Sequence, residues 1–109
     1  MSTAVFLYPQ ALQKFSVQMQ AVLLILNADP YLKKNIEPFI NFETETISWD
    51  QILKIALSSG HRAAITWAYC IWTDELRPRS NPFDAALSMN QNLQLAVLQA
   101  LALRWCLKF

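Results

Sequence analysis

The chain contains a single glycine, Gly60, among its 109 residues. Sandwiches and barrels of β-strands are rich in tight turns, so this scarcity argues against both architectures. A glycine-rich phosphate-binding loop is excluded for the same reason. Charged residues are also few, at 16%, whereas hydrophobic residues reach 54%, and this combination argues against intrinsic disorder. Leu, Ala and Gln are abundant, and these residues favour helices.

Strong charge of one sign and long hydrophobic runs are likewise missing. Nine basic and eight acidic side chains leave a net charge of +1, which gives no long-range attraction to nucleic acid or an anionic membrane. The longest apolar runs, residues 21–26 and 95–103, are well short of the roughly 18 residues that a membrane-spanning helix needs. The N-terminus lacks the basic opening and cleavage site of a signal peptide. We therefore expect a soluble, cytoplasmic protein without membrane contact.

Residues 60–72 form the most apolar stretch of the sequence. After His61 and Arg62, this stretch contains one polar side chain, Thr66, in ten residues. A helix that is apolar on every side is buried on every side. The sequence thus predicts a buried central helix over residues 60–76, which ends because Arg77-Pro78 cannot continue it.

Other helices are predicted around this central helix. Apolar residues recur at helical spacing from Gln10 to about Leu26, and Gln20 falls on the expected wet side. Asp29-Pro30 is a helix-start pair, and Pro38 ends the short helix that follows. Two further helix starts have the pattern of a capping box, in which a serine and a glutamine three residues later satisfy the first N–H groups. These are Ser48 with Gln51, and Ser88 with Gln91, the latter opening a last helix to about Leu107.

Two segments have the composition of extended chain. Residues 4–8 are apolar, and residues 39–47 alternate loosely and are rich in aromatic and β-branched side chains, so the two could pair. The fold class that we predict is mainly α: a compact bundle of four or five helices round the central helix, in a single domain of residues 1–109. Cys70 and Cys106 lie in apolar contexts typical of buried free thiols, although a disulfide between them stays open.

His61 is the single histidine and is predicted to lie in the first turn of the central helix. There the helix dipole disfavours its charged form, and no carboxylate partner is near in sequence, although Ser58 and Ser59 are. We expect His61 to form hydrogen bonds at the helix start. One histidine and two widely separated cysteines lack the paired spacing of zinc ligands. The sequence therefore predicts no catalytic residue, no metal and no cofactor, and a protein that is not an enzyme.

A DNA-binding helix-turn-helix over residues 48–72 is the alternative interpretation. Ala56 precedes Gly60 by four positions, as in helix-turn-helix units, and the basic pairs 33–34 and 77–79 could contact phosphates. A recognition helix should expose polar side chains to the bases, but here only His61, Arg62 and Thr66 are available. We therefore expect an ordinary helical hairpin and regard nucleic acid as the weaker partner.

A protein partner fits two parts of the sequence better. Residues 39–47 combine aromatic and acidic side chains on what could be an open sheet edge, suited to β-augmentation. The chain end, residues 105–109, is apolar, which suggests packing into the core or across a homodimer through the C-terminal helix. The candidate partner-binding residues are Phe39, Phe42, Glu43, Glu45, Arg77 and Arg79.

A resemblance covers residues 52–103. The residues that carry it are Leu53, Ala56, the run Ser59-Gly60-His61-Arg62, Ala64, Ala68, Trp72, Phe83-Asp84, Leu87 and Val97-Leu98. In these positions the chain resembles a small family of uncharacterised domains of proteobacterial genomes, often found on integrated or plasmid-borne elements. Similar members usually have glutamine at the position of His61 and aspartate near Asn90, so no catalytic role is implied. The resemblance implies an accessory role on mobile DNA, such as that of a phage protein that inhibits or modulates a host complex.

Overall fold

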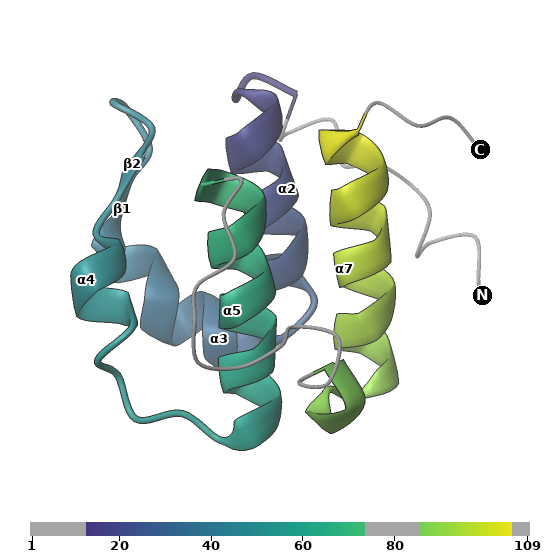
Figure 1. Cartoon of the computed structure of the whole chain (residues 1–109). Helices are drawn as coiled ribbons and strands as arrows, with labels where there is room; N and C mark the ends of the chain where they lie inside the picture. The colour runs from purple at the N-terminus through teal and green to yellow at the C-terminus, as the bar shows by residue number, and fades with distance from the viewer. Residues whose placement is uncertain (1–12, 74–85, 106–109) are drawn as a thin grey trace.

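The computed structural model describes residues 13–73 and 86–105 and confirms a mainly helical, compact architecture (Figure 1). The elements are α2 (Val17–Asn27), α3 (Pro30–Ile36), the 3₁₀ turn η2 (Glu37–Phe39), β1 (Ile40–Asn41), β2 (Thr46–Ile47), α4 (Trp49–Ile52), α5 (Ser59–Thr73), the 3₁₀ turn η3 (Ala86–Ser88) and α7 (Gln91–Arg104). The predicted segment 4–8, the segment between Thr73 and Ala86 and the chain end beyond Trp105 lie outside the described residues.

Three helices, α2, α5 and α7, stand side by side, with α2 running opposite to the other two (Figure 1). Helix α2 packs against both α5 and α7, and its most extensive contact is with α7. The β-hairpin and α4 lie on the side of α5 away from α7 (Figure 1). This arrangement places the hairpin at the edge of the bundle rather than inside it.

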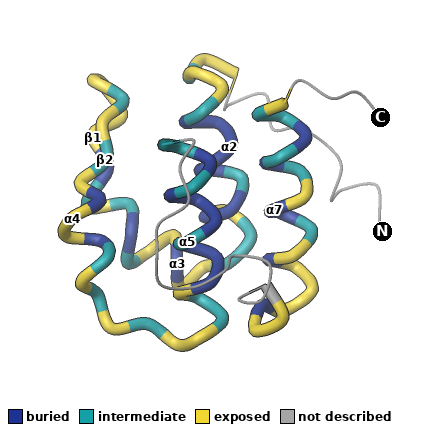
Figure 2. The backbone as a smooth tube through the Cα atoms, in the orientation of Figure 1, coloured by how far each residue is buried: buried dark blue, intermediate teal, exposed yellow. Residues whose placement is uncertain are grey.

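The prediction of a buried central helix is confirmed for α5, although α2 shares the centre with it (Figure 2). On α5 the buried residues are Ala63, Ala64, Ile65, Trp67, Ala68, Tyr69 and Ile71. On α2 they are Met19, Gln20, Ala21, Val22, Leu23, Ile25 and Leu26. Because α2 has neighbours on several sides, its girth is as fully enclosed as that of α5.

The helix predicted from Gln10 to about Leu26 is wrong for residues 13–15, which form a turn and a bend; Gln10 itself lies outside the described residues. Ser16 is extended and accepts a hydrogen bond from the N–H of Met19 at 3.3 Å, so the helix begins at Val17. The assignment of Gln20 to the wet side is also wrong. Gln20 is buried, and its amide donates to the backbone carbonyl of Phe15, which satisfies the polar group inside the bundle.

The predicted start at Asp29-Pro30 is confirmed, whereas the two predicted capping boxes are not formed. Ser48 makes no side-chain capping bond, and Asn90 rather than Ser88 accepts the first-turn N–H of α7, at 2.9 Å from Leu93. An asparagine two residues after the serine is an equally good cap, and the helix starts there.

Helix α4 is a single turn, so residues 48–72 form neither the helical hairpin that the sequence predicts nor the helix-turn-helix unit of the alternative interpretation. In residues 53–58, Leu53, Ile55 and Leu57 are half-buried while the residues between them are exposed. Residues 53–55 form a turn, in which the N–H groups of Lys54 and Ile55 donate to the carbonyls of Gln51 and Ile52, and residues 56–58 have no regular structure. The three apolar side chains pack against the core. A continued helix would have spread these side chains round its girth.

Residues 39–47 are extended in part, as predicted, but fold back on themselves. Ile40 pairs with Ile47 and Asn41 with Thr46 in an antiparallel hairpin. The turn is fixed by Asn41, whose Oδ1 accepts the N–H groups of Glu43 at 3.0 Å and Thr44 at 3.1 Å. These two strands form the only sheet of the described residues. The predicted pairing with residues 4–8 falls outside them.

Candidate functional site

The tip of the hairpin is anchored to the start of α2. The rings of Phe15 and Phe42 lie 5.8 Å apart, and the N–H of Ser16 donates to Oε1 of Glu45 at 2.9 Å. Hydrogen bonds from Ser16 hold the pKa of Glu45 below its usual range. Glu45 adopts a left-handed φ of 54°, which the turn imposes. Its carboxylate therefore positions the hairpin, and its predicted role in partner binding stays a prediction.

The base of the hairpin is anchored to α5 by aromatic packing. Trp49, which follows the hairpin, packs edge-on against Tyr69 with ring centres 5.3 Å apart, and its ring lies 6.5 Å from that of Trp72. Phe39 and Ile47 are half-buried against the core. The hairpin is thus fixed at both ends, which suits a preformed binding surface.

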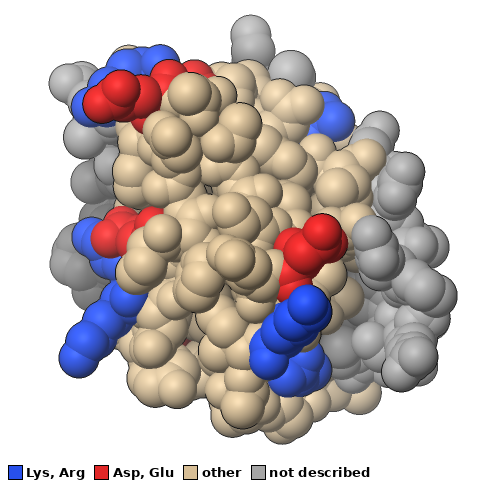
Figure 3. Space-filling model, turned by 90° about the vertical axis from the view of Figure 1, so that its left-hand side faces the viewer, with Lys and Arg blue, Asp and Glu red and all other residues tan. Residues whose placement is uncertain are grey.

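An open hollow lies beside the hairpin. Its volume is about 480 Å³, and its lining residues are Pro38, Phe39, Ile40, Asn41, Phe42, Glu43, Thr46, Ser48 and Gln51. A second hollow of about 450 Å³ adjoins it along residues 47–51. Figure 3 shows this side of the molecule as a broad uncharged area with Lys, Arg, Asp and Glu gathered at its margins. We call the lining residues of these two hollows the hairpin surface.

The structure brings three of the six predicted partner-binding residues together on the hairpin surface. Phe42 is 37% exposed and Glu43 is exposed, while Phe39 lines the hollow with part of its ring on the core. Arg77 and Arg79 lie outside the described residues.

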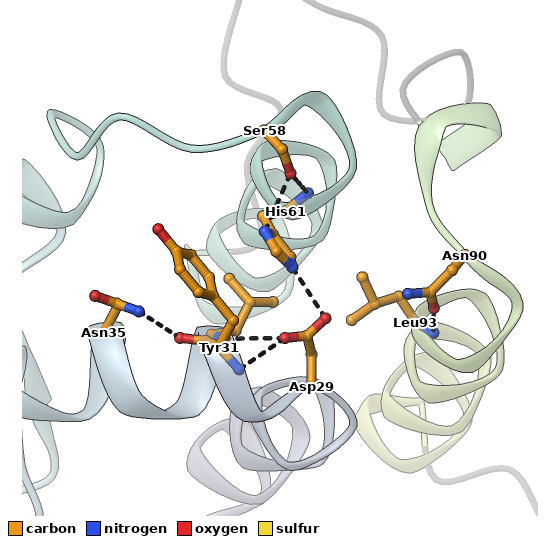
Figure 4. A network of polar contacts seen from close by, with 8 residues as sticks. Asp29, Tyr31, Asn35, Ser58, His61, Asn90 and Leu93 are labelled. Atoms are coloured by element: carbon orange, nitrogen blue, oxygen red, sulfur yellow. Dashed lines mark hydrogen bonds and ion pairs between the residues drawn. The ribbon is translucent and has the colours of Figure 1, made fainter.

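A second candidate site is a polar network that joins Asp29, His61 and Ser58 (Figure 4). Nε2 of His61 lies 2.9 Å from Oδ2 of Asp29, and Nδ1 lies 3.1 Å from Oγ of Ser58. The ring of Tyr31 stacks on the imidazole at 4.8 Å with an interplanar angle of 10°. His61 does form hydrogen bonds at the helix start, as predicted, and it also reaches a carboxylate 32 positions away in the sequence.

The same three residues fix the ends of two helices. Oδ1 of Asp29 accepts the N–H groups of Tyr31 at 2.9 Å and Leu32 at 3.2 Å, and Oγ of Ser58 accepts the N–H of His61 at 3.3 Å. Burial raises the pKa of Asp29, but the hydrogen bond from His61 and those from Leu32 and Tyr31 outweigh it, so the pKa is lowered. Asp29 therefore remains an ionised acceptor for both α3 and His61.

Sequence reasoning noted that Ser58 and Ser59 lie near His61 in the chain, without choosing a partner, and it missed Asp29. Asp29 was recognisable as a helix cap, yet its contact with His61 depends on how α2 and α3 place the α3 start against α5. No local spacing encodes that contact.

Residues 13–73 and 86–105 contain no group of three or more His, Cys, Asp or Glu that could hold a metal ion. Cys70 is a half-buried free thiol. Within the same ranges, no helix has the length and apolar character required to cross a bilayer.

The fold and these two sites define the class of the protein as a small mainly helical bundle with an edge hairpin. No protein-family model, curated protein or solved structure matches the chain.

Proposed function

We propose that the chain is a protein-binding module that holds an extended segment of a partner protein on the hairpin surface. The observation that carries this proposal is the open hollow beside a hairpin that is anchored at both ends and exposes Phe42. The outer edges of β1 and β2 have no further strand beside them in the described part of the chain. An extended segment could add main-chain hydrogen bonds at such an edge and place side chains in the hollow.

The charges of the hairpin surface select the partner's chemistry. Glu43 lines the first hollow and Asp50 the second, whereas no Lys or Arg among the described residues lines either. Complementary charge favours encounter with the correct partner and disfavours others. We therefore expect a segment with an apolar or aromatic side chain for Phe42 and a flanking Lys or Arg for the acidic pair.

Binding rather than catalysis is the role that suits this surface. Its lining residues include hydroxyl side chains but no histidine to activate them. A DNA-binding regulator finds less support, because α4 is a single turn. In the mobile-element setting that the resemblance implies, the partner would belong to a host or phage complex, such as a defence system.

Selection from a displayed library of random peptides tests the proposal. Peptides enriched on the wild-type chain should share an apolar position flanked by a basic one, and should bind at high salt in the presence of nuclease. The double variant Phe42→Ser/Glu43→Lys should lose this binding. The matched control is Leu87→Ser, which changes an apolar side chain that is 84% exposed on η3, away from the hairpin surface. Peptides that bind all three chains equally, or retention of nucleic acid alone, would contradict the proposal.

Self-association through α7 is a second candidate, favoured by its exposed apolar side chains. Leu98 is 61% and Trp105 62% exposed, and their separation of seven residues places them on one side of the helix, two turns apart. A homodimer through this side of α7 would cover both. Light scattering over a concentration series should show dimers that Leu98→Glu converts to monomers, and a chain that stays monomeric throughout would rule the dimer out.

A further inference from the structure

We propose that Ser58 is an activated nucleophile that reacts with acyl esters and related electrophiles, in addition to the protein binding proposed for the hairpin surface. The inference rests on the order of groups in the polar network. A carboxylate, an imidazole and a hydroxyl follow one another at 2.9 and 3.1 Å, within the range of nucleophile–base–carboxylate arrangements.

The hydrogen-bond directions in the network fix the tautomer of His61. The Asp29 carboxylate can only accept, so Nε2 of His61 carries the proton that bridges them. In the neutral imidazole, Nδ1 is then the unprotonated nitrogen and accepts the hydroxyl proton of Ser58. Oγ of Ser58 in turn accepts the N–H of His61 at 3.3 Å. His61 is thus held in the form that can act as a general base towards Ser58.

The surroundings also favour negative charge on Oγ as it attacks. Ser58 precedes the fifteen-residue helix α5, so its oxygen lies at the positive end of the helix dipole. The Ser58 side chain is exposed, whereas those of His61 and Asp29 are 22% and 13% exposed. The nucleophile is therefore open to a substrate while the groups behind it are largely shielded from water. Tyr31 stacks on the His61 ring and limits its rotation.

The reaction would proceed by ordinary acyl transfer. Oγ of Ser58 forms a bond to the carbonyl carbon of the ester while its proton passes to Nδ1 of His61. The bond between the acyl carbon and the alcohol oxygen then breaks, and the proton moves from Nδ1 to the departing alkoxide. A water molecule repeats both steps on the acyl-serine, which releases the carboxylic acid and restores Ser58. In this scheme Ser58 and His61 are catalytic residues and Asp29 is a positioning residue.

Ser16 provides an internal control in the same molecule. It also precedes a helix, α2, is exposed, and accepts a first-turn N–H at 3.3 Å, from Met19. The group beside it is the Glu45 carboxylate, whose lowered pKa makes it a poor base, rather than an imidazole. Any reactivity that comes from the capping position alone is therefore shared by Ser16 and Ser58. A higher reaction rate at Ser58 than at Ser16 measures the contribution of His61 and Asp29.

Labelling of the full chain with a fluorophosphonate reagent tests the inference. Oγ–P forms, P–F breaks, fluoride leaves, and the hydroxyl proton passes through His61 to solvent. Peptide mass spectrometry then gives the rate at each serine. General-base catalysis contributes about 100-fold or more, so Ser58 should react at least about 100-fold faster than Ser16 in the wild-type protein. Equal rates at the two serines would overturn the inference without any variant.

Variants assign the roles within the network. His61→Gln and Asp29→Asn should bring the Ser58 rate down towards that of Ser16, and free imidazole should restore it in His61→Ala. Ser59→Ala, which changes the neighbouring exposed serine, should leave the ratio unchanged. A purely structural role for Asp29 would alter stability but not the ratio of the two rates. A ratio that His61→Gln leaves at the wild-type value would contradict the role of His61 as the base.

Discussion

At Gly60, helix α5 lies close to the backbone of η3. A Cβ atom on this residue would lie 2.7 Å from the carbonyl oxygen of Ser88, a distance that neither backbone can accommodate without moving. The glycine is therefore required by close approach.

Gly60→Ala should lower the free energy of unfolding by about 1–3 kcal/mol, as overpacking does elsewhere. Chemical denaturation measures the change. Ser59→Ala is the control in the same turn, and because Ser59 is exposed it should change stability by no more than about 0.5 kcal/mol. A Gly60→Ala variant as stable as the wild type would show that the contact with Ser88 is looser than described.

Asp29 should make stability depend on pH in the acid range. Its pKa is lowered in the folded chain, so the unfolded chain binds a proton more readily than the folded one. The resulting stabilisation is fully present above the ordinary value of 3.8 and is lost as pH falls through the lower folded pKa. Unfolding midpoints should therefore fall as pH drops below about 4.

Asp29→Asn isolates this effect. Asparagine can still cap α3, but a hydrogen bond to a neutral acceptor is weaker, so the variant should lose about 1 kcal/mol at neutral pH. Its stability should also decline less on acidification than that of the wild type. Glu45, whose pKa is lowered by Ser16, contributes in the same direction, so Glu45→Gln is the necessary comparison. Identical acid profiles for wild type and Asp29→Asn would contradict the assignment.

The serines and asparagine at helix starts differ between the caps that the structure shows and the caps that the sequence pattern predicts. Ser16 and Asn90 accept first-turn N–H groups, and their replacement by alanine should cost about 1 kcal/mol each. Ser48 makes no such bond and Ser88 lies within η3, so Ser48→Ala and Ser88→Ala should stay within about 0.5 kcal/mol. Thermal unfolding of the four variants decides the matter, and the reverse ranking would restore the predicted capping boxes.

The elements that the sequence predicts correctly are those whose signals are local. Asp29-Pro30 starts α3 because both residues act within one turn, and the apolar girth of α5 needs no neighbour to be recognised. The end of α4 after Ile52 was not predictable in the same way. The apolar residues that follow Ile52 have a spacing that fits either a helix or an extended chain. Their packing against the core, which the sequence does not show, determines their conformation.

The two candidate sites also differ in whether a local sequence signal predicts them. Phe42 and Glu43 were found because residues 39–47 have the composition of an open edge. Asp29 and His61 meet because α2, α3 and α5 converge, and the sequence carries no spacing that reports such a contact. The polar network could therefore be recognised only in three dimensions.

At the scale of the whole molecule, the bundle has two enclosed helices rather than one. The sequence pointed to α5 because almost all its side chains are apolar, whereas Gln20 made α2 resemble a surface helix. Burial of Gln20 is possible because its side chain donates to the carbonyl of Phe15. A buried glutamine with a hydrogen-bond partner therefore makes the burial of α2 difficult to predict from sequence, although α2 packs against α3, α5 and α7.

Truncation on the two helices should therefore be equally damaging. Leu26 on α2 and Ile65 on α5 are 0% and 2% exposed, and replacement of either by alanine should cost about 2–5 kcal/mol. Leu98→Ala, at 61% exposure, should cost no more than about 0.5 kcal/mol. Since one core contains both residues, the two variants should unfold in a single transition with an unchanged dependence on denaturant concentration. If Leu26→Ala cost as little stability as Leu98→Ala, the burial of α2 would be contradicted and α5 would be the single central helix of the bundle.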